Sequence, residues 1–317
     1  MLIAMQDDVR LPRMQTGANP QHLIVTLLGD YWFGRAERLP SLTLVALANE
    51  FDITSTSARA ALGRLARRGL LDSSKAGRRT FYGLTPRAQQ MLTGGVRRIM
   101  SFGLSHDRWD GSWLVVTYSV PEHQRDVRHV LRARLRWLGF APLYDGVWVS
   151  PRSDATEAVA LLEELGIASS NVLVSRVAHA VNGGDPLSAW KLDELRQVYA
   201  AFVAEFEPLL GRAEGGDVVP AEALIARTRV MDVWRQFPNL DPELPETALP
   251  PGWPRREAQR IFANLYDALG PLAEQRFKEI VSEHAPDLAC RARLLTTTSI
   301  TTAPFLRSSL ASPLEAS

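Results

Sequence analysis

The chain has 317 residues, of which 46% are hydrophobic and 22% are charged, and its formal net charge is +1. This composition excludes a disordered chain and is typical of a soluble globular protein long enough for two or three domains. No apolar run approaches the ~18 residues of a membrane helix, Asp7 and Asp8 stand where a signal peptide needs its apolar region, and the single cysteine, Cys290, excludes an intrachain disulfide, so we expect a cytoplasmic protein without a membrane partner.

The positive charge is concentrated in one part of the chain. Residues 21–100 contain twelve basic and five acidic residues, whereas the chain from residue 101 onward contains 22 basic and 28 acidic residues. A basic surplus confined to one region indicates a segment that binds an anionic partner, and nucleic acid is the obvious candidate.

Residues 1–20 show no periodic pattern, and we expect them to be irregular. Hydrophobic periodicity then predicts three helices, over residues 22–33, 41–51 and 54–69. Ser41 is the expected N-cap of the second helix. Asp52 and Ile53 leave room only for a tight turn before the third.

The third expected helix carries only basic charges. Its apolar residues recur at near-helical spacing and should face the core, namely Ala58, Leu62, Leu65 and Leu70. Its arginines lie on the other faces. Short hydroxyl side chains at its start can cap the free N–H groups of the helix, and they can also contact phosphates or base edges.

Residues 69–86 alternate around a polar turn at Gly77, the pattern of a two-stranded hairpin with a basic tip. Thr85 then caps a further helix that has Pro86 at its first position. Two helices, a basic helix and a basic hairpin predict a winged helix-turn-helix domain over residues 21–100, which binds double-stranded DNA. The predicted DNA-binding residues are Ser55, Thr56, Ser57, Arg59, Arg64, Arg67, Lys75, Arg78 and Arg79.

Individual arginines of this region have alternative interpretations. Arg64 can pair with Glu50, and Arg68 can oppose the dipole at the C-terminus of its helix. We therefore rank Arg59, with Ser55 and Thr56, as the residues that face the major groove.

From Ser112 the pattern changes to alternating strands and helices. In order, a strand, a helix, a hairpin, a helix and a strand are expected at residues 112–120, 122–138, 140–151, 155–166 and 171–177. The hairpin should turn at Asp145 and Gly146. The order βαββαβ predicts a ferredoxin-like middle domain over residues 110–182.

The rest of the chain is expected to be helical. Helices are predicted over residues 192–210, 221–236, 254–269 and 271–284, which form an all-helical C-terminal domain over residues 187–285. Residues 286–317 have no clear period and are expected to be a flexible tail. The predicted fold class is therefore α+β, with three domains.

Nothing in the sequence indicates an enzyme. No P-loop, G-x-G-x-x-G, G-x-S-x-G or H-E-x-x-H motif occurs, and the six histidines are scattered without ligand spacing. We therefore predict no catalytic residues, no cofactor and no metal site. Aromatic and basic residues of the middle domain could stack and hold an aromatic, anionic ligand, or could serve as core and dimer contacts: Arg132, Arg136, Trp137, Tyr144 and Trp148.

Several separated blocks, in this order, resemble the PaaX family of repressors of phenylacetic acid catabolism. The blocks are "LIVTLLGDYWF" at 23–33, "SARAALGRLARRGLL" at 57–71, "GRRTFYGLTP" at 77–86, and "WDGSWLVVTYSVPE" leading to "LRARLRWLGFAPLYDGVWVSP" at 109–151. This resemblance implies a homodimeric repressor that a CoA thioester such as phenylacetyl-CoA releases from its operator. Another acyl- or aryl-CoA stays open as the effector, as do a ligand-independent DNA-binding protein and an enzyme fused to a DNA-binding domain.

The middle domain also resembles the small endonuclease subunit of CRISPR adaptation. That family places a metal-binding aspartate at the end of the first strand, where this chain has Ser119. Without a carboxylate to hold Mg²⁺ a nuclease lacks its means of charge stabilisation. We therefore interpret the domain as a scaffold.

Overall fold

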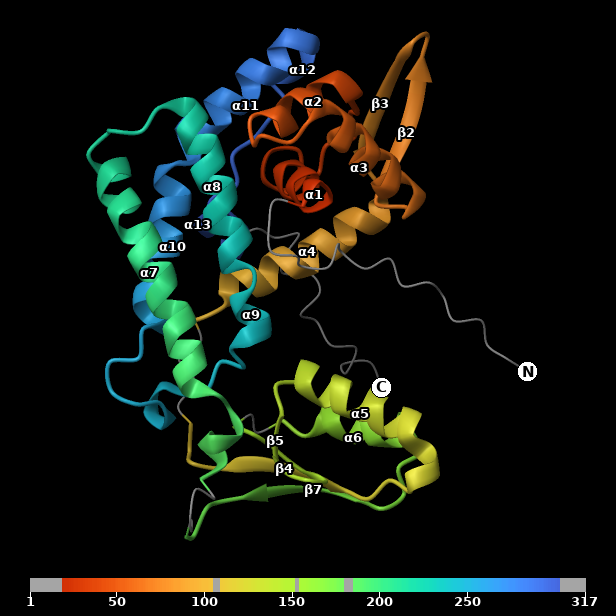
Figure 1. The fold of residues 1–317 in the computed structure, drawn as a ribbon, viewed down its shortest axis with the longest axis vertical. Coiled ribbons are helices and arrows are strands. Elements are labelled where there is room, and N and C mark those ends of the chain that lie inside the picture. The colour runs from red at the N-terminus through yellow and green to blue at the C-terminus, as the bar shows by residue number, and fades with distance from the viewer. Residues whose placement is uncertain (1–18, 105–108, 152–153, 180–184, 303–317) are drawn as a thin grey trace, which may run out of the picture. The chain divides into compact units, whose positions relative to one another are not determined.

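A computed structural model describes residues 19–104, 109–151, 154–179 and 185–302 (Figure 1). Helices and two small antiparallel sheets make an α+β protein, as the sequence predicts. The chain forms two compact units. The first contains Met1–Ser101, Glu205–Arg235 and Arg260–Ser317, and the second contains Phe102–Ala204 and Gln236–Gln259. The expected irregular segment lies outside the described residues, apart from Asn19 and Pro20.

The N-terminal part of the first unit is a helical cluster with a three-stranded sheet. Its elements are α1 (Pro20–Tyr31), β1 (Leu39–Pro40), α2 (Ser41–Asn49), α3 (Ser55–Arg67), β2 (Leu71–Ala76), β3 (Arg79–Leu84) and α4 (Pro86–Ser101). The strands are antiparallel in the order β1-β3-β2. All expected helices and the hairpin are present. β1 was not predicted, because a two-residue strand that contains a proline shows no alternation.

The helix ends in this part differ in detail from the expectation. Thr54 is the N-cap of α3, and the Ser57 N–H donates to its hydroxyl oxygen at 3.2 Å. Ser41 is the first residue of α2 rather than its cap, since Pro40 takes the cap position and forms no side-chain cap bond. The Ala88 N–H donates to the Thr85 hydroxyl at 3.1 Å, so the predicted cap of α4 is confirmed.

The remaining helices match the predicted ones to within a few residues at most boundaries. They are α7 (Leu192–Glu214), α8 (Pro220–Trp234), α10 (Arg255–Ala268) and α11 (Gly270–His284), with the short α9 (Phe237–Leu240), α12 (Pro286–Ala289) and α13 (Thr297–Thr302). Single 3₁₀ turns occur at Glu122–Gln124, Pro186–Ala189 and Glu246–Ala248. α7 extends past its expected end even though Pro208 lies inside it.

The first unit is organised around a fully buried arginine of α8. Arg227 lies over the rings of Tyr266 and Tyr31, at 3.7 Å and 5.2 Å from their centroids. Its guanidinium donates to the carbonyl oxygens of Tyr266 at 3.0 Å and Leu295 at 2.5 Å, and lies 3.6 Å from the Asp30 carboxylate. Three segments distant in sequence therefore meet at one cation.

The described part of the expected tail packs as regular structure. Residues 286–302 contain α12 and α13, and Ala292 and Leu295 between them are buried. Thr297 binds Asp267 of α10 through its hydroxyl at 2.7 Å. The expectation of a flexible tail is therefore wrong for residues 286–302. The segment is held by hydrogen bonds to the helices, and hydrophobic periodicity does not detect such bonds. Residues 303–317 lie outside the described residues.

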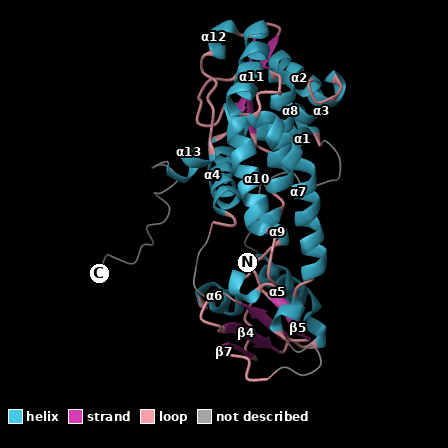
Figure 2. Cartoon of the chain, turned by 90° about the vertical axis from the view of Figure 1, so that its left-hand side faces the viewer, coloured by secondary structure: helices cyan, strands magenta, loops and turns pink. Residues whose placement is uncertain are grey.

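The second unit contains a four-stranded antiparallel sheet. Its elements are β4 (Trp113–Tyr118), α5 (Arg125–Trp137), β5 (Ala141–Tyr144), β6 (Val147–Ser150), α6 (Thr156–Glu164) and β7 (Ser170–Ser175). The strand order is β5-β6-β4-β7. α5 and α6 cover one face of this sheet, and strand and helix alternate as the sequence predicts (Figure 1, Figure 2).

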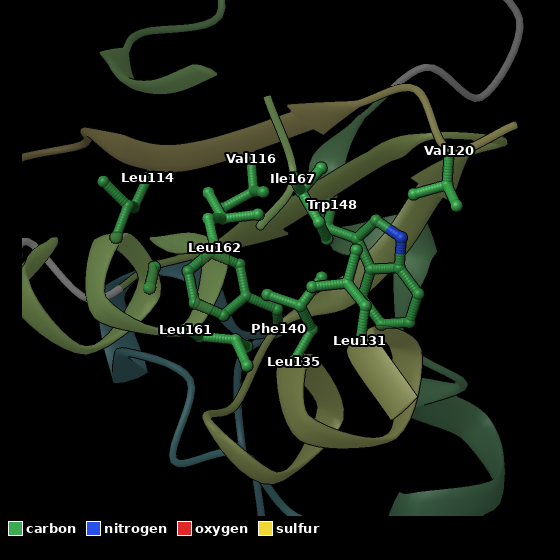
Figure 3. Packing of buried hydrophobic residues seen from close by; sticks show 11 residues of the cluster. Leu114, Val116, Val120, Leu131, Leu135, Phe140, Trp148, Leu161, Leu162 and Ile167 are labelled. Atoms are coloured by element: carbon green, nitrogen blue, oxygen red, sulfur yellow. The ribbon is translucent and has the colours of Figure 1, made fainter. Parts of the chain in front are cut away.

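The space between these helices and the sheet is filled with apolar side chains (Figure 3). Leu131 and Leu135 of α5 and Leu161 of α6 pack with Val116 and Trp148 of the strands, and none of these five is more than 1% exposed. The hairpin turns at Asp145 and Gly146, as predicted. This unit thus has its own hydrophobic core.

Candidate nucleic-acid interface

α3 presents a basic face to solvent. Its apolar residues Ala58, Leu62 and Leu65 are at most 1% exposed, so the opposite side is free of the core. Residues three and four apart share a face of a helix. Thr56, Arg59 and Arg67 therefore lie along one side, and each of them is exposed.

The three hydroxyl side chains predicted to contact DNA at the start of α3 differ in their exposure to solvent. Thr56 is exposed, whereas Ser55 and Ser57 are half-buried. Capping is done by Thr54, so the three side chains that follow it are not needed for that purpose. Arg64 is exposed as well, on the flank of the helix.

The hairpin that follows α3 carries the second basic group. Lys75 pairs with Thr80 and Ala76 with Arg79, which leaves Gly77 and Arg78 as the turn. Gly77 has a φ of +59°, a conformation that glycine adopts without strain. Lys75, Arg78 and Arg79 are all exposed at the tip of this two-stranded ribbon, which Figure 1 shows projecting beside α3.

None of these basic side chains is neutralised by the part of the chain that the structure describes. Arg59, Arg64, Arg67, Lys75, Arg78 and Arg79 have no hydrogen-bond or ion-pair partner there. The alternative pairing of Arg64 with Glu50 is wrong, because Arg276 of α11 binds both oxygens of Glu50 at 2.8 and 2.9 Å. Exposed arginines without an acidic partner suit the phosphates of nucleic acid.

An ion pair links the hairpin to the segment before β1, and the sequence analysis did not predict it. Arg38 precedes β1, and its guanidinium binds the Asp72 carboxylate of β2 through Nε at 3.1 Å and Nη2 at 2.5 Å. The hydrogen bond from Arg38 holds the pKa of Asp72 below its usual value. Residues 34 positions apart give no local signal, and β1 itself was not expected.

The predicted ligand-binding residues of the second unit do not form one site. Trp148 is fully buried and donates from Nε1 to the Tyr118 hydroxyl at 3.2 Å, with the Arg136 guanidinium 5.4 Å from its ring centroid. Trp137 and Tyr144 are 69% and 59% exposed. Arg132 lies 3.5 Å from Asp145. Of these five residues, Arg136 and Trp148 are in direct contact.

A hollow of about 510 Å³ lies at one end of the same sheet. It is lined mainly by polar residues, including Thr117, Ser119, Asp145, Ser169 and Asn171. None of the five predicted ligand-binding residues lines it. Because more of its wall is polar than apolar, this open hollow offers little apolar surface to an aromatic ring.

Tryptophans of the second unit lie on both faces of its sheet. Trp109 and Trp113 are in edge contact at 5.0 Å, and Trp190 stacks on Trp113 at 5.9 Å. Trp148 belongs to the core on the other face of the sheet. The tryptophans are therefore not gathered into one binding site.

Two further kinds of site are absent from the described residues. No group of three or more His, Cys, Asp or Glu side chains there is arranged to hold a metal ion. Within the same ranges, no helix combines the length and the apolar character needed to cross a membrane.

Comparison with known proteins gives consistent matches along the chain. Three family descriptions match: "PaaX-like protein" over residues 19–88, "PaaX protein central Cas2-like domain" over residues 106–186, and "PaaX-like protein C-terminal domain" over residues 190–279.

The transcriptional repressor PaaX of Escherichia coli (strain K12) is 26% identical over 258 residues, which are 79% of this chain and 80% of that protein. Among solved structures, the uncharacterized protein Rv0674 from Mycobacterium tuberculosis is similar in fold. It superposes with a TM-score of 0.51 at 20% identity, over 80% of this chain and 96% of that one. From the three matches in order, and from the relative that spans most of the chain, we conclude that the protein is a member of the PaaX family, which points to a regulator rather than an enzyme.

Proposed function

We propose that this protein is a homodimeric transcriptional repressor of a phenylacetate-like catabolic pathway, which an aryl- or acyl-CoA thioester such as phenylacetyl-CoA releases from its operator. In this proposal residues 21–100 form a winged helix-turn-helix, residues 110–182 a ferredoxin-like scaffold and residues 187–285 a helical domain. The order of helices, basic helix and hairpin in the first segment supports the winged helix. The strand order β5-β6-β4-β7 supports the ferredoxin-like arrangement.

The observation that carries the proposal is the group of six exposed basic side chains on α3 and the hairpin tip, none of which has a partner in the described chain. In a winged helix the second helix of the helix-turn-helix enters the major groove. Ser55, Thr56 and Arg59, near the start of α3, then face the major groove, with Ser57 beside them. Lys75, Arg78 and Arg79 contact phosphates or the minor groove.

A dimer explains how such a small surface selects an operator. Two copies of α3 read half-sites whose centres lie about 34–36 Å apart, or a multiple of that spacing. Release by an effector requires that it bind the non-binding state more tightly. Moving the equilibrium from 1:99 to 99:1 takes about 5.5 kcal/mol of differential affinity.

The test is fluorescence anisotropy of the protein on DNA from its own upstream promoter, with the salt concentration varied. We expect tight, sequence-dependent binding that weakens steeply with salt. Titration with phenylacetyl-CoA is expected to reverse binding, and free phenylacetate is the matched control. Binding that ignores both compounds contradicts this effector and favours a ligand-independent DNA-binding protein. Absence of any DNA binding contradicts the proposal as a whole.

A further inference from the structure

The Arg38 side chain crosses β3 to bind the Asp72 carboxylate. The sheet order is β1-β3-β2, so β3 lies between Arg38, which precedes β1, and Asp72 in β2. The two bonds from the guanidinium to the carboxylate, at 3.1 and 2.5 Å, form a bidentate pair. Both side chains are about two-fifths exposed, so the pair lies on the surface of the sheet. The hydrogen bond to Asp72 also raises the pKa of Arg38.

The strand between them has a glycine at the crossing point. Gly83 of β3 stands directly opposite Asp72 in the ladder. A Cβ atom on Gly83 would lie 3.0 Å from Cγ of Arg38 and 3.3 Å from Oδ1 of Asp72. Its backbone is ordinary strand, outside the left-handed region, so a larger residue here would crowd the Arg38–Asp72 pair without straining the backbone.

We infer that Arg38 is a positioning residue, which ties the hairpin β2–β3 to β1 through Asp72 and across Gly83 and so fixes where the basic hairpin tip stands relative to α3. β1 runs directly into α2, and α2 packs on α3, so the tie connects the two basic groups of the surface. A two-stranded ribbon is only marginally rigid by itself. This inference rests on the proposed DNA-binding function.

The tie has an electrostatic consequence as well. Asp72 is the one acidic residue of the hairpin sequence at 71–84, "LDSSKAGRRTFYGL". Arg38 neutralises it within the sheet, so the hairpin approaches DNA without a free carboxylate. Because Arg38 is itself exposed, direct contact of Arg38 with a phosphate is the competing explanation, and the variants below separate the two.

Three variants make the distinction. Arg38→Met removes the tie and a positive charge. Asp72→Asn removes the tie but leaves Arg38 charged and removes a negative charge. Gly83→Ala obstructs the crossing and changes no charge. Asp52→Asn is the matched control, since Asp52 lies just before α3 and its left-handed backbone, at φ 59°, is compatible with asparagine.

If Arg38 positions the hairpin, Asp72→Asn and Gly83→Ala both weaken operator binding by about three- to tenfold, as lost hairpin phosphate contacts would. The slope of log K against log salt then falls by about one to two units. In a background that carries Lys75→Ala, Arg78→Ala and Arg79→Ala, neither variant has a further effect, because the hairpin-tip contacts through which they act are gone. Equal or tighter binding by Asp72→Asn, as freeing Arg38 for phosphate would give, overturns the inference.

Hydrogen exchange in the free protein tests the tie without DNA. The amides of residues 71–84 are expected to exchange at least about fivefold faster in Asp72→Asn, and unchanged in Asp52→Asn. Unchanged exchange in both overturns the inference, even if the chain does not bind DNA at all. Failure of the wild type to bind DNA, with faster exchange in Asp72→Asn, contradicts the proposed function and supports the tie.

Discussion

Two helices of this protein are rich in arginine, and they differ in whether their arginines have partners within the described chain. α5 contains five arginines, and α3 contains three within its bounds. Arg125 and Arg128 lie beside Glu122, Arg132 beside Asp145 and Arg134 beside Glu164, while Arg136 lies over the Trp148 ring. The arginines of α3 have no such partner in the described chain.

We therefore expect DNA binding where basic side chains lack acidic partners, and not simply where basic side chains are most numerous. The partners of α5 come from the turn before the helix, the β5–β6 turn and the end of α6. Glu122 is close to its arginines in sequence, but Asp145 and Glu164 lie 13 and 30 positions from Arg132 and Arg134, so a local charge count cannot detect these two pairs. The following predictions test this comparison in order of decreasing effect.

The most deeply buried arginine is expected to matter most for stability. Arg227→Met removes a cation that is 0% exposed and leaves Asp30 buried without it. We expect the free energy of unfolding to fall by about 3–5 kcal/mol, measured by urea denaturation. Arg229→Met, two residues along the same helix at an exposed pair with Glu205, is the control and should cost less than about 1 kcal/mol. If Arg227→Met and Arg229→Met lowered the free energy of unfolding equally, burial of Arg227 would not be what makes it important for stability.

An uncompensated arginine should instead matter for binding. Arg59→Ala is expected to weaken operator binding by about 1–3 kcal/mol and to relax the base preference at one position. The matched control is Arg134→Ala in α5, whose guanidinium is already bound to Glu164 at 2.7 Å. Anisotropy titrations on the operator and on single-base variants measure both. If Arg134→Ala weakened binding as much as Arg59→Ala, the comparison of the two helices would fail.

The hairpin tip is expected to contribute less, and without sequence preference. Arg78→Ala should weaken binding to specific and unrelated DNA alike, because a phosphate contact carries no base information. The slope of log K against log salt is expected to decrease by about one unit. A change confined to the operator would show that Arg78 reads bases.

The smallest expected effect is that of a surface pair of α5 on stability. The hydrogen bond from Arg134 lowers the pKa of Glu164 below 4.5. A carboxyl whose folded pKa is depressed stabilises the fold above its unfolded pKa, and this contribution is lost as the pH falls through the folded value. Glu164→Gln should therefore lower the urea midpoint slightly at pH 7 and by progressively less as the pH falls through the folded pKa of Glu164. If the difference in urea midpoint between wild type and Glu164→Gln grew toward low pH, the pKa of Glu164 would be raised in the folded state and not lowered.

Local patterns were sufficient for most elements of the fold. α3 was expected at 54–69 and spans Ser55–Arg67, and the turns at Gly77 and Gly146 are where glycine was read as a turn signal. These features depend on periodicity and turn chemistry within a few residues. The buried faces followed from the same spacing, as Ala58 and Leu65 of α3 show.

Features that depend on distant partners were not accessible in this way. The Arg38–Asp72 pair needs the register of a strand too short to recognise. The place of residues 286–302 depends on acceptors for Arg227 and donors for Asp267, which no periodicity reveals. That the predicted residues contact DNA stays a prediction; the exposure of Thr56 and of the six basic side chains agrees with it, whereas Ser55 and Ser57 are half-buried.

The environment of Arg227 also has a consequence for how the chain is made. Its partners are Asp30 and Tyr31 in the first helix and the carbonyl of Leu295, near the end of the described chain. A ribosome delivers these groups in order, so α1 emerges long before the last of them exists. The first helix can form early, but the packing around its buried cation can be completed only once residue 295 has emerged. The N-terminal part of the first unit therefore reaches its final packing well after its own residues have been synthesised.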